Sequence, residues 1–202
     1  DARKSRGLGD VYKRQIGINS LSAVGIGTTI YFVTTWLFIF LAYGTTPYVA
    51  DLNINKKFSS LNYFILFGRR VSVYLGIAVF IIVWVFDSAL IDLFKPTIEV
   101  KEFSSTYLIA RSLGIGFFLL NMHSTAVLRG LRFPKYTTLS SLISTVLNIF
   151  LSFLLGIIFN FGVLGVGLAS TISFLVASIY STYILNIKIR MLEKSVESID
   201  KE

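Results

Sequence analysis

The segments YTTLSSLISTVLNIFLSFLLGIIF (residues 136–159) and VLGVGLASTISFLVASIYSTYILNI (residues 163–187) decide the fold of this chain. Each is a mostly apolar run of more than twenty residues, and about 20 such residues suffice for a helix to cross the hydrocarbon core of a bilayer. Only Asn160, Phe161 and Gly162 separate the two runs, which leaves room for a tight turn. The sequence therefore predicts two antiparallel membrane-spanning helices.

Three further apolar runs precede this pair, at residues 18–43, 71–94 and 104–128. Proline or charged residues lie between successive runs, at Pro47 with 53–57, at Lys95–Pro96, and at 129–135. The composition agrees with lipid surroundings: 54% of residues are hydrophobic, 15% are charged, and the mean hydropathy is +0.72. We therefore expect an all-α polytopic membrane helical bundle, with five transmembrane helices within residues 16–190.

The basic residues of the connecting segments predict how the helices are oriented. Cytoplasmic loops of membrane proteins are enriched in Lys and Arg. On one side of the membrane, the connecting segments carry only Lys95 and Lys101, beside Glu99 and Glu102. The opposite side carries most of the basic residues: Lys56, Lys57, Arg69, Arg70, Arg129, Arg132, Lys135, Lys188, Arg190, Lys194 and Lys201. This side is expected in the cytoplasm, so residue 18 starts outside.

The two ends of the chain are expected to lie outside the bundle. Residues 1–15 (DARKSRGLGDVYKRQ) are polar and basic, lack an apolar signal-peptide core, and resemble translated sequencing adapter. Their five Lys and Arg residues would lie on the outer side, against the rule that the other loops follow. We interpret this segment as a non-native leader. Residues 191–202 are interpreted as a cytoplasmic linker.

Polar residues within the apolar runs are candidates for a site. Ser141, Thr145, Asn148 and Ser152 recur at spacings of four, three and four, which places them on one helix face. Polar groups at membrane depth face either a partner helix or a water-filled cavity, and the pattern alone favours neither. The following helix carries a stripe of small residues that favours close helix packing: Gly165, Ala169, Ser173, Ala177 and Ser181. Ser170 and Thr171 lie beside this stripe.

Two ionisable residues lie in the run at 104–128. Arg111 is about two turns from its outer end, where its side chain can reach the interface or pair inside the bundle. His123 is the only histidine, and a structural role is favoured over proton relay.

Several other function classes lack support in the sequence. There are no cysteines, hence no Cys-ligated metal site, and one histidine provides no metal site. No cofactor, phosphate-binding or hydrolase motif occurs, which argues against an enzyme. The net charge of +8 lies mainly between the apolar runs, so no nucleic acid is expected as a partner.

An ordered series of segments resembles the multidrug and toxic compound extrusion (MATE) family of efflux transporters. WLFIFLAYGTTPYVAD (36–51) resembles the second family helix, YLIARSLG (107–114) the fourth with its Arg, and LRGLRFPK (128–135) the following loop. Asn148 and GVLGVGLASTIS (162–173) resemble the fifth helix and the entry into the sixth. The branch named for DNA-damage induction is the most similar.

This resemblance implies family helices two to six, part of the N-terminal lobe of a twelve-helix transporter. It implies a cation-coupled antiporter in a bacterial inner membrane that exports drugs or metabolites, such as organic cations or amphiphiles, in exchange for protons or sodium. The first helix, with its acidic residue, and the second lobe would complete it. In several members the Asn that matches Asn148 is followed four residues later by an Asp, and a Thr that matches Thr171 faces the same cavity. Here Ser152 replaces that Asp and cannot carry its charge, so the resemblance does not decide between protons and sodium as the coupling ion.

Two alternatives remain. A lipid-linked oligosaccharide flippase of the same superfamily would need several cationic side chains in its cavity, and this chain offers Arg111 alone. A non-transporting membrane scaffold would not need the polar face of residues 141–152. Under the transporter interpretation, membrane lipid and a small-molecule substrate are the expected partners, and Ser141, Thr145, Asn148, Ser152, Thr171 and Arg111 line the cavity.

Overall fold

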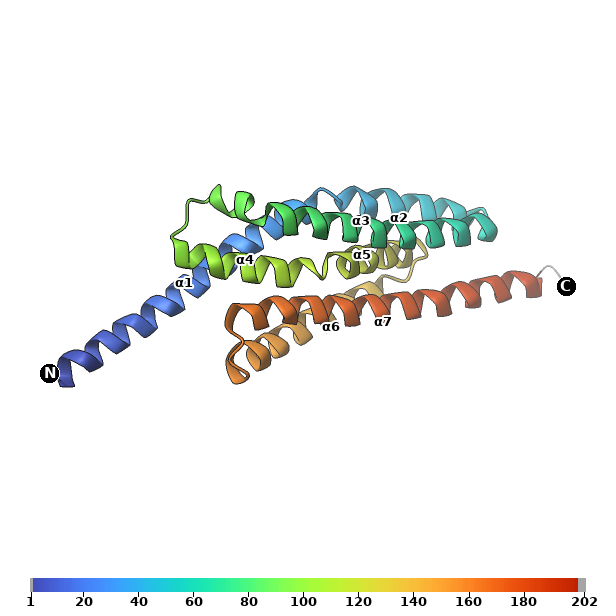
Figure 1. Cartoon of the computed structure of the whole chain (residues 1–202). Helices are drawn as coiled ribbons and strands as arrows, with labels where there is room; N and C mark the ends of the chain where they lie inside the picture. Colours follow the sequence, from blue (N-terminus) through green and yellow to red (C-terminus); the bar gives the residue numbers. More distant parts are fainter. Residues whose placement is uncertain (1, 200–202) are drawn as a thin grey trace.

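The computed structural model describes residues 2–199, with side chains for residues 17–40 and 42–193. The described part is built from helices without a strand (Figure 1). The all-α prediction is therefore confirmed. The helices are α1 (Ala2–Trp36), α2 (Ile39–Ile54), α3 (Phe58–Asp92), α4 (Ile98–Ser112), α5 (Ile115–Gly130), α6 (Pro134–Phe153), the π-helix η1 (Leu154–Ile158) and α7 (Gly162–Ile199).

Three helices are long and apolar enough to cross a membrane by length and composition: α3, α6 continued by η1, and α7 up to Glu193. A fourth span forms if α4 and α5 count as one, since these two helices meet at a bend of 44°. The predicted run at 104–128 is thus broken at Leu113 and Gly114. The predicted run at 18–43 is divided between α1 and α2 at Leu37 and Phe38, and neither half meets the same criterion.

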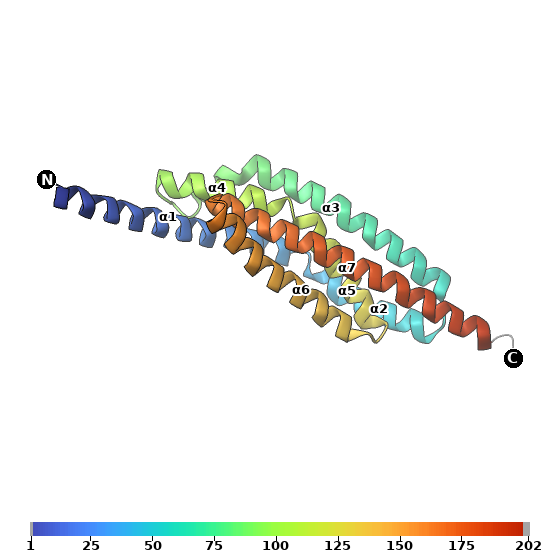
Figure 2. The ribbon, with the colours of Figure 1, turned by 90° about the horizontal axis from the view of Figure 1, so that it is seen from below.

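Several helices extend beyond the predicted apolar runs. After the turn at Lys56, whose φ is 54°, α3 begins at Phe58, well before the predicted start at residue 71. Helix α7 continues to Ile199, so the linker prediction falls on helical residues up to that point, and residues 200–202 lie outside the described residues. Helix α1 starts at Ala2, and its first turns extend past the other helices (Figures 1 and 2). The leader interpretation of residues 1–15 stays a prediction.

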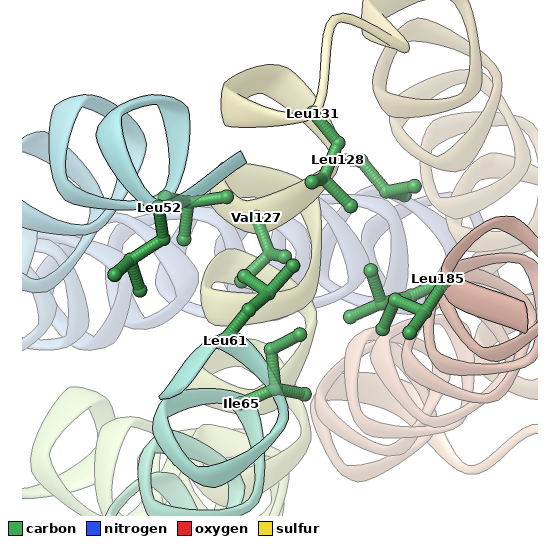
Figure 3. Close-up of a cluster of buried hydrophobic side chains, with 9 residues drawn as sticks. Leu52, Leu61, Ile65, Val127, Leu128, Leu131 and Leu185 are labelled. Atoms are coloured by element: carbon green, nitrogen blue, oxygen red, sulfur yellow. The ribbon is translucent and has the colours of Figure 1, made fainter. Parts of the chain in front are cut away.

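The basic loops come together at one end of the bundle. There α2, α3, α5 and α7 share a cluster of buried aliphatic side chains, among them Leu52, Leu61, Leu128 and Leu185 (Figure 3). At the opposite end, Asn19 Nδ2 donates to Glu99 Oε2 at 2.8 Å, and Lys101 Nζ lies 2.6 Å from Asp92 Oδ1. Because lipid tails are as apolar as these side chains, close van der Waals packing holds the helices together at the basic end.

The small-residue stripe of α7 is a packing surface, as predicted. All five of its residues are buried, and α7 makes its most extensive contact with α6 (Figure 2). At Gly165 an added Cβ would lie 2.6 Å from the Leu155 carbonyl carbon. The two helices approach closely because these side chains are small.

Surface labelling tests the predicted orientation. The chain has no cysteine, so single thiols can be introduced by the matched exchanges Ser60→Cys and Thr97→Cys, both at exposed positions. An impermeant thiol reagent added to intact cells should label Thr97→Cys, beside the acidic outer loop, and should label Ser60→Cys only after lysis. The opposite labelling pattern would show that the predicted orientation in the membrane is reversed.

Candidate functional site

The polar face predicted on α6 is largely open in the structure. Ser141 and Thr145 are exposed, and Asn148 and Ser152 are half-buried. The hydroxyl groups of Ser141, Thr145 and Ser152 form no hydrogen bond within residues 17–193. Packing of α6 on its neighbours uses the adjacent Ser140 instead. The predicted face is therefore not the one by which α6 packs on the described helices.

Ser140 is the buried polar contact of α6. Its side chain is 0% exposed, and its Oγ lies 2.8 Å from Asn121 Oδ1 on α5 and 3.4 Å from the Ala177 carbonyl oxygen on α7. Hydrogen bonds of this kind between membrane helices average about 0.6 kcal/mol. Sequence reasoning missed this residue because it lies one position from the predicted face.

Asn148 is the exception on the open face, since it contacts α7. Its Nδ2 donates to Ser170 Oγ at 2.9 Å, and Ser170 Oγ in turn donates to the Val166 carbonyl oxygen at 3.3 Å. Because the Ser170 proton is used by Val166, Ser170 acts as an acceptor toward Asn148, and this fixes the orientation of the amide. The Asn148 Oδ1 atom accepts no hydrogen bond from the part of the chain with described side chains.

Thr171 lies on another face of α7 and donates a hydrogen bond to a backbone carbonyl at the bend between α4 and α5. At the bend, the Gly114 amide donates to the Arg111 carbonyl at 3.0 Å, which leaves the Ala110 carbonyl without its helical donor. Thr171 Oγ1 donates to that Ala110 oxygen at 2.8 Å. In a membrane a broken helix persists only where such groups find partners. The hydroxyl of Thr171 therefore contacts α4, whereas the side chain of Asn148 contacts Ser170 on α7.

Arg111 is held by aromatic and hydroxyl groups of α1 and α4. Its guanidinium carbon lies 4.4 Å from the ring centroid of Tyr31, and Nη1 donates to the Tyr107 hydroxyl. Nη1 also lies 3.4 Å from Thr28 Oγ1, while Nε is buried without a partner. No carboxylate pairs with Arg111 within residues 17–193. The side chain of Arg111 is thus held by α1 and α4, and its assignment to the cavity stays a prediction.

Replacement of Arg111 by methionine is expected to change stability by less than about 1 kcal/mol. The variant loses cation–π stacking, worth about 0.5–2 kcal/mol, and the contacts of Nη1 with Tyr107 and Thr28. These losses are offset because a buried charge without a carboxylate partner is also removed. Arg111→Ala should be clearly less stable, since it also leaves a cavity between α1 and α4. Size-exclusion chromatography after graded heating compares the two variants, and equal losses would contradict this balance.

His123 is a packing residue on α5. Its side chain is 3% exposed, and its ring lies so close to Gly68 on α3 that a Cβ there would collide with it. Its Nε2 has no hydrogen-bond partner in the described part of the chain. Among residues with described side chains, no three His, Asp or Glu groups are placed to hold a metal ion.

Sequence reasoning found Arg111 but missed the groups that hold it. Tyr107 precedes Arg111 by four residues and therefore shares its helix face, a signal present in the sequence. Tyr31 comes from α1, and its ring also packs against Phe118 and Phe174 at 6.3 and 6.4 Å. No local spacing predicts a contact between helices that are eighty residues apart.

An all-helical bundle with several helices long and apolar enough to cross a membrane is the architecture of a polytopic membrane protein. The family model described as MatE matches residues 12–154, more than half of the chain. The chain belongs to the MatE family, whose members are transporters. No curated protein matches the chain by sequence.

Solved structures of MATE transporters have the same fold. A MATE protein in the bent conformation is 22% identical with a TM-score of 0.77, and the match covers 82% of this chain and 37% of that chain. An inward-facing multidrug resistance MATE family transporter of the MOP superfamily is 22% identical with a TM-score of 0.77, and the match covers 82% of this chain and 38% of that chain. A MOP superfamily transporter from Pyrococcus furiosus, whose reverse polarity of the binding pocket suggests a different function, is 23% identical with a TM-score of 0.77. That match covers 93% of this chain and 42% of that chain. The chain spans about two fifths of their length.

Proposed function

We propose that this chain is part of a cation-coupled antiporter that exports drugs or metabolites by alternating access, with protons or sodium as the coupling ion. Family membership supports transport, and the open polar face of α6 supports the location of the site. The substrate is proposed to be an organic cation or amphiphile, and the membrane a bacterial inner membrane. The DNA-damage-inducible branch is proposed on sequence resemblance alone.

The observation that carries the proposal is the free carbonyl oxygen of Asn148. Its amide nitrogen is anchored to Ser170, so Oδ1 is held in one orientation and remains available. Carbonyl oxygens are suitable ligands for a hard cation such as sodium, and they also accept a hydrogen bond from a protonated carboxyl group. Ser141, Thr145 and Ser152 extend this polar face along α6, away from the contacts with α5 and α7. Polar groups facing lipid are costly, which favours a water-filled cavity over lipid at this face.

Alternating access places such a site near the bilayer midplane, between two parts of the protein that rock against each other. Asn148 lies in the middle of the span formed by α6 and η1, which agrees with that depth. An amide has no charge to lose, so Asn148 orients the coupling ion while an acidic group elsewhere titrates. Ser152 cannot supply that acid.

The proposal is tested with the full-length transporter in proteoliposomes. Uptake of a fluorescent organic cation should require an imposed proton or sodium gradient, and collapse of that gradient by a selective ionophore should stop it. The gradient that supports transport identifies the coupling ion. Transport that persists without either gradient would exclude coupled antiport, and movement of a lipid-linked oligosaccharide in its place would support a flippase.

A further inference from the structure

Helices α3 and α7 lie on either side of α5 and leave a groove between them. Both pack extensively on α5, whereas they make little direct contact with each other (Figures 1 and 2). Four cavities of about 310–390 Å³ lie along this line. Neighbouring cavities adjoin one another, since they share lining residues such as Leu120, Thr182, Arg69 and Asn186.

Most of the groove is apolar and open to the outside of the bundle. Val73 and Ile77 of α3 and Ile179 of α7 form its walls, with Phe117 and Leu120 of α5 as the floor. Val73, Ile77 and Ile179 are exposed. An acyl chain is the group in a bilayer that matches such a long apolar surface.

The end of the groove near the basic loops is polar and positively charged. Arg69 Nη2 donates to Asn186 Oδ1 at 2.7 Å, while Arg69 Nε is buried without a partner in the described part of the chain. Arg70 and Arg190 line the same end. The acidic residue there, Glu193, already accepts a hydrogen bond from Asn62 Nδ2 at 2.5 Å. Three arginines against one carboxylate leave an excess of positive charge.

This charged end lies at the level of the lipid headgroups. Arg69 and Arg70 immediately precede the apolar run that starts at residue 71, and Arg190 follows the one that ends at residue 187. Tyr74 and Tyr183 are 70% and 63% exposed beside the groove, and Tyr is enriched at membrane interfaces.

We propose that this groove binds an anionic phospholipid, with its phosphate on Arg69 and Arg190 and one acyl chain along Val73 and Leu120. Arginine is suited to phosphate because its planar donors match two oxygens at once. Basic pockets between membrane helices on the cytoplasmic side are known to bind anionic headgroups. The inference rests on the groove and its charges and is independent of the transport site.

The headgroup is tested by native mass spectrometry of the delipidated chain in detergent, titrated with palmitoyl-oleoyl phosphatidylglycerol. The double variant Arg69→Gln/Arg190→Gln should bind about tenfold more weakly, since it loses two charge-assisted contacts. Arg132→Gln/Lys57→Gln is the matched control, because it also removes two positive charges, from exposed residues of the basic loops at the same end. Phosphatidylethanolamine, with no net charge, should bind more weakly than phosphatidylglycerol. Equal affinity of the groove double variant and the Arg132→Gln/Lys57→Gln control would overturn the proposal.

The acyl chain is tested separately by filling the groove. Val73→Trp should weaken phosphatidylglycerol binding severalfold, whereas Val85→Trp, also on an exposed position of α3, should not. An excess of glycerol phosphate should fail to displace the lipid. If glycerol phosphate displaces it at similar concentration, or if Val73→Trp has no effect, the groove is a simple phosphate site and the lipid assignment is wrong. Far-UV circular dichroism of each variant confirms that it is folded.

Discussion

Replacing Asn148 with alanine is expected to lower gradient-driven export by the full-length protein at least about tenfold, a loss of about 1.4 kcal/mol in coupling. The substitution removes the free Oδ1 together with the amide that Ser170 orients. Asn148 is half-buried and makes one hydrogen bond to another helix, so protein yield and thermal stability should change little. Export of a fluorescent cation from energised vesicles measures the effect under separate proton and sodium gradients.

Two neighbouring positions serve as controls for Asn148. Ser152→Ala should have a much smaller effect, because its hydroxyl makes no hydrogen bond within residues 17–193, and Ser152→Asp should shift the pH dependence of export by adding a carboxylate. Ser140→Ala should lower stability by about 0.6 kcal/mol and leave the dependence on the gradient intact, because Ser140 is a packing residue. If Asn148→Ala behaves like Ser140→Ala, the amide contributes only to packing.

The second large effect is expected at the crossing of α3 and α5, where two glycines face each other. A Cβ at Gly76 would lie 2.7 Å from the Gly116 nitrogen, whereas a Cβ at Gly116 would lie 3.8 Å from the nearest atom, the Gly76 Cα. Gly76→Ala should therefore destabilise the bundle by about 1–3 kcal/mol, because the obstacle is backbone and cannot rotate away. Gly116→Ala should be neutral or slightly stabilising, since alanine favours a helix over glycine by about 1 kcal/mol.

The same substitution at two facing positions isolates the geometry. Denaturation with sodium dodecyl sulfate, followed by circular dichroism, gives the free energy of unfolding for both variants. A result in which Gly116→Ala is as damaging as Gly76→Ala would mean that the two helices do not cross as described.

The sequence predicted the helices well and their ends poorly. Apolar runs identified α3, α6 and α7, because a helix that crosses lipid must be apolar over its whole length. The starts and ends failed at Phe58 and Ile199, since hydropathy reports depth in the membrane and a helix continues into water at little cost. The bend at Gly114 was also missed, because its stability depends on Thr171 from a distant helix.

The sequence predicted which polar side chains share a helix face but not which neighbours they contact, and their role in a site stays a prediction. Helical spacing correctly placed Ser141, Thr145, Asn148 and Ser152 on one face, since spacing is a property of a single helix. It could not show that Ser140 makes the buried contact instead, or that Thr171 contacts α4 while Asn148 contacts Ser170. Which neighbour a face meets is set by tertiary packing.

The bend between α4 and α5 has a consequence for biosynthesis. Thr171, whose hydroxyl satisfies the Ala110 carbonyl, is made 61 residues after it. Because synthesis runs from the N-terminus, α4 and α5 leave the ribosome before the donor that stabilises the break between them. Until α7 arrives, that carbonyl can be satisfied only by water or by a straighter helix. The bent span thus acquires its final shape only after α7 has packed against it.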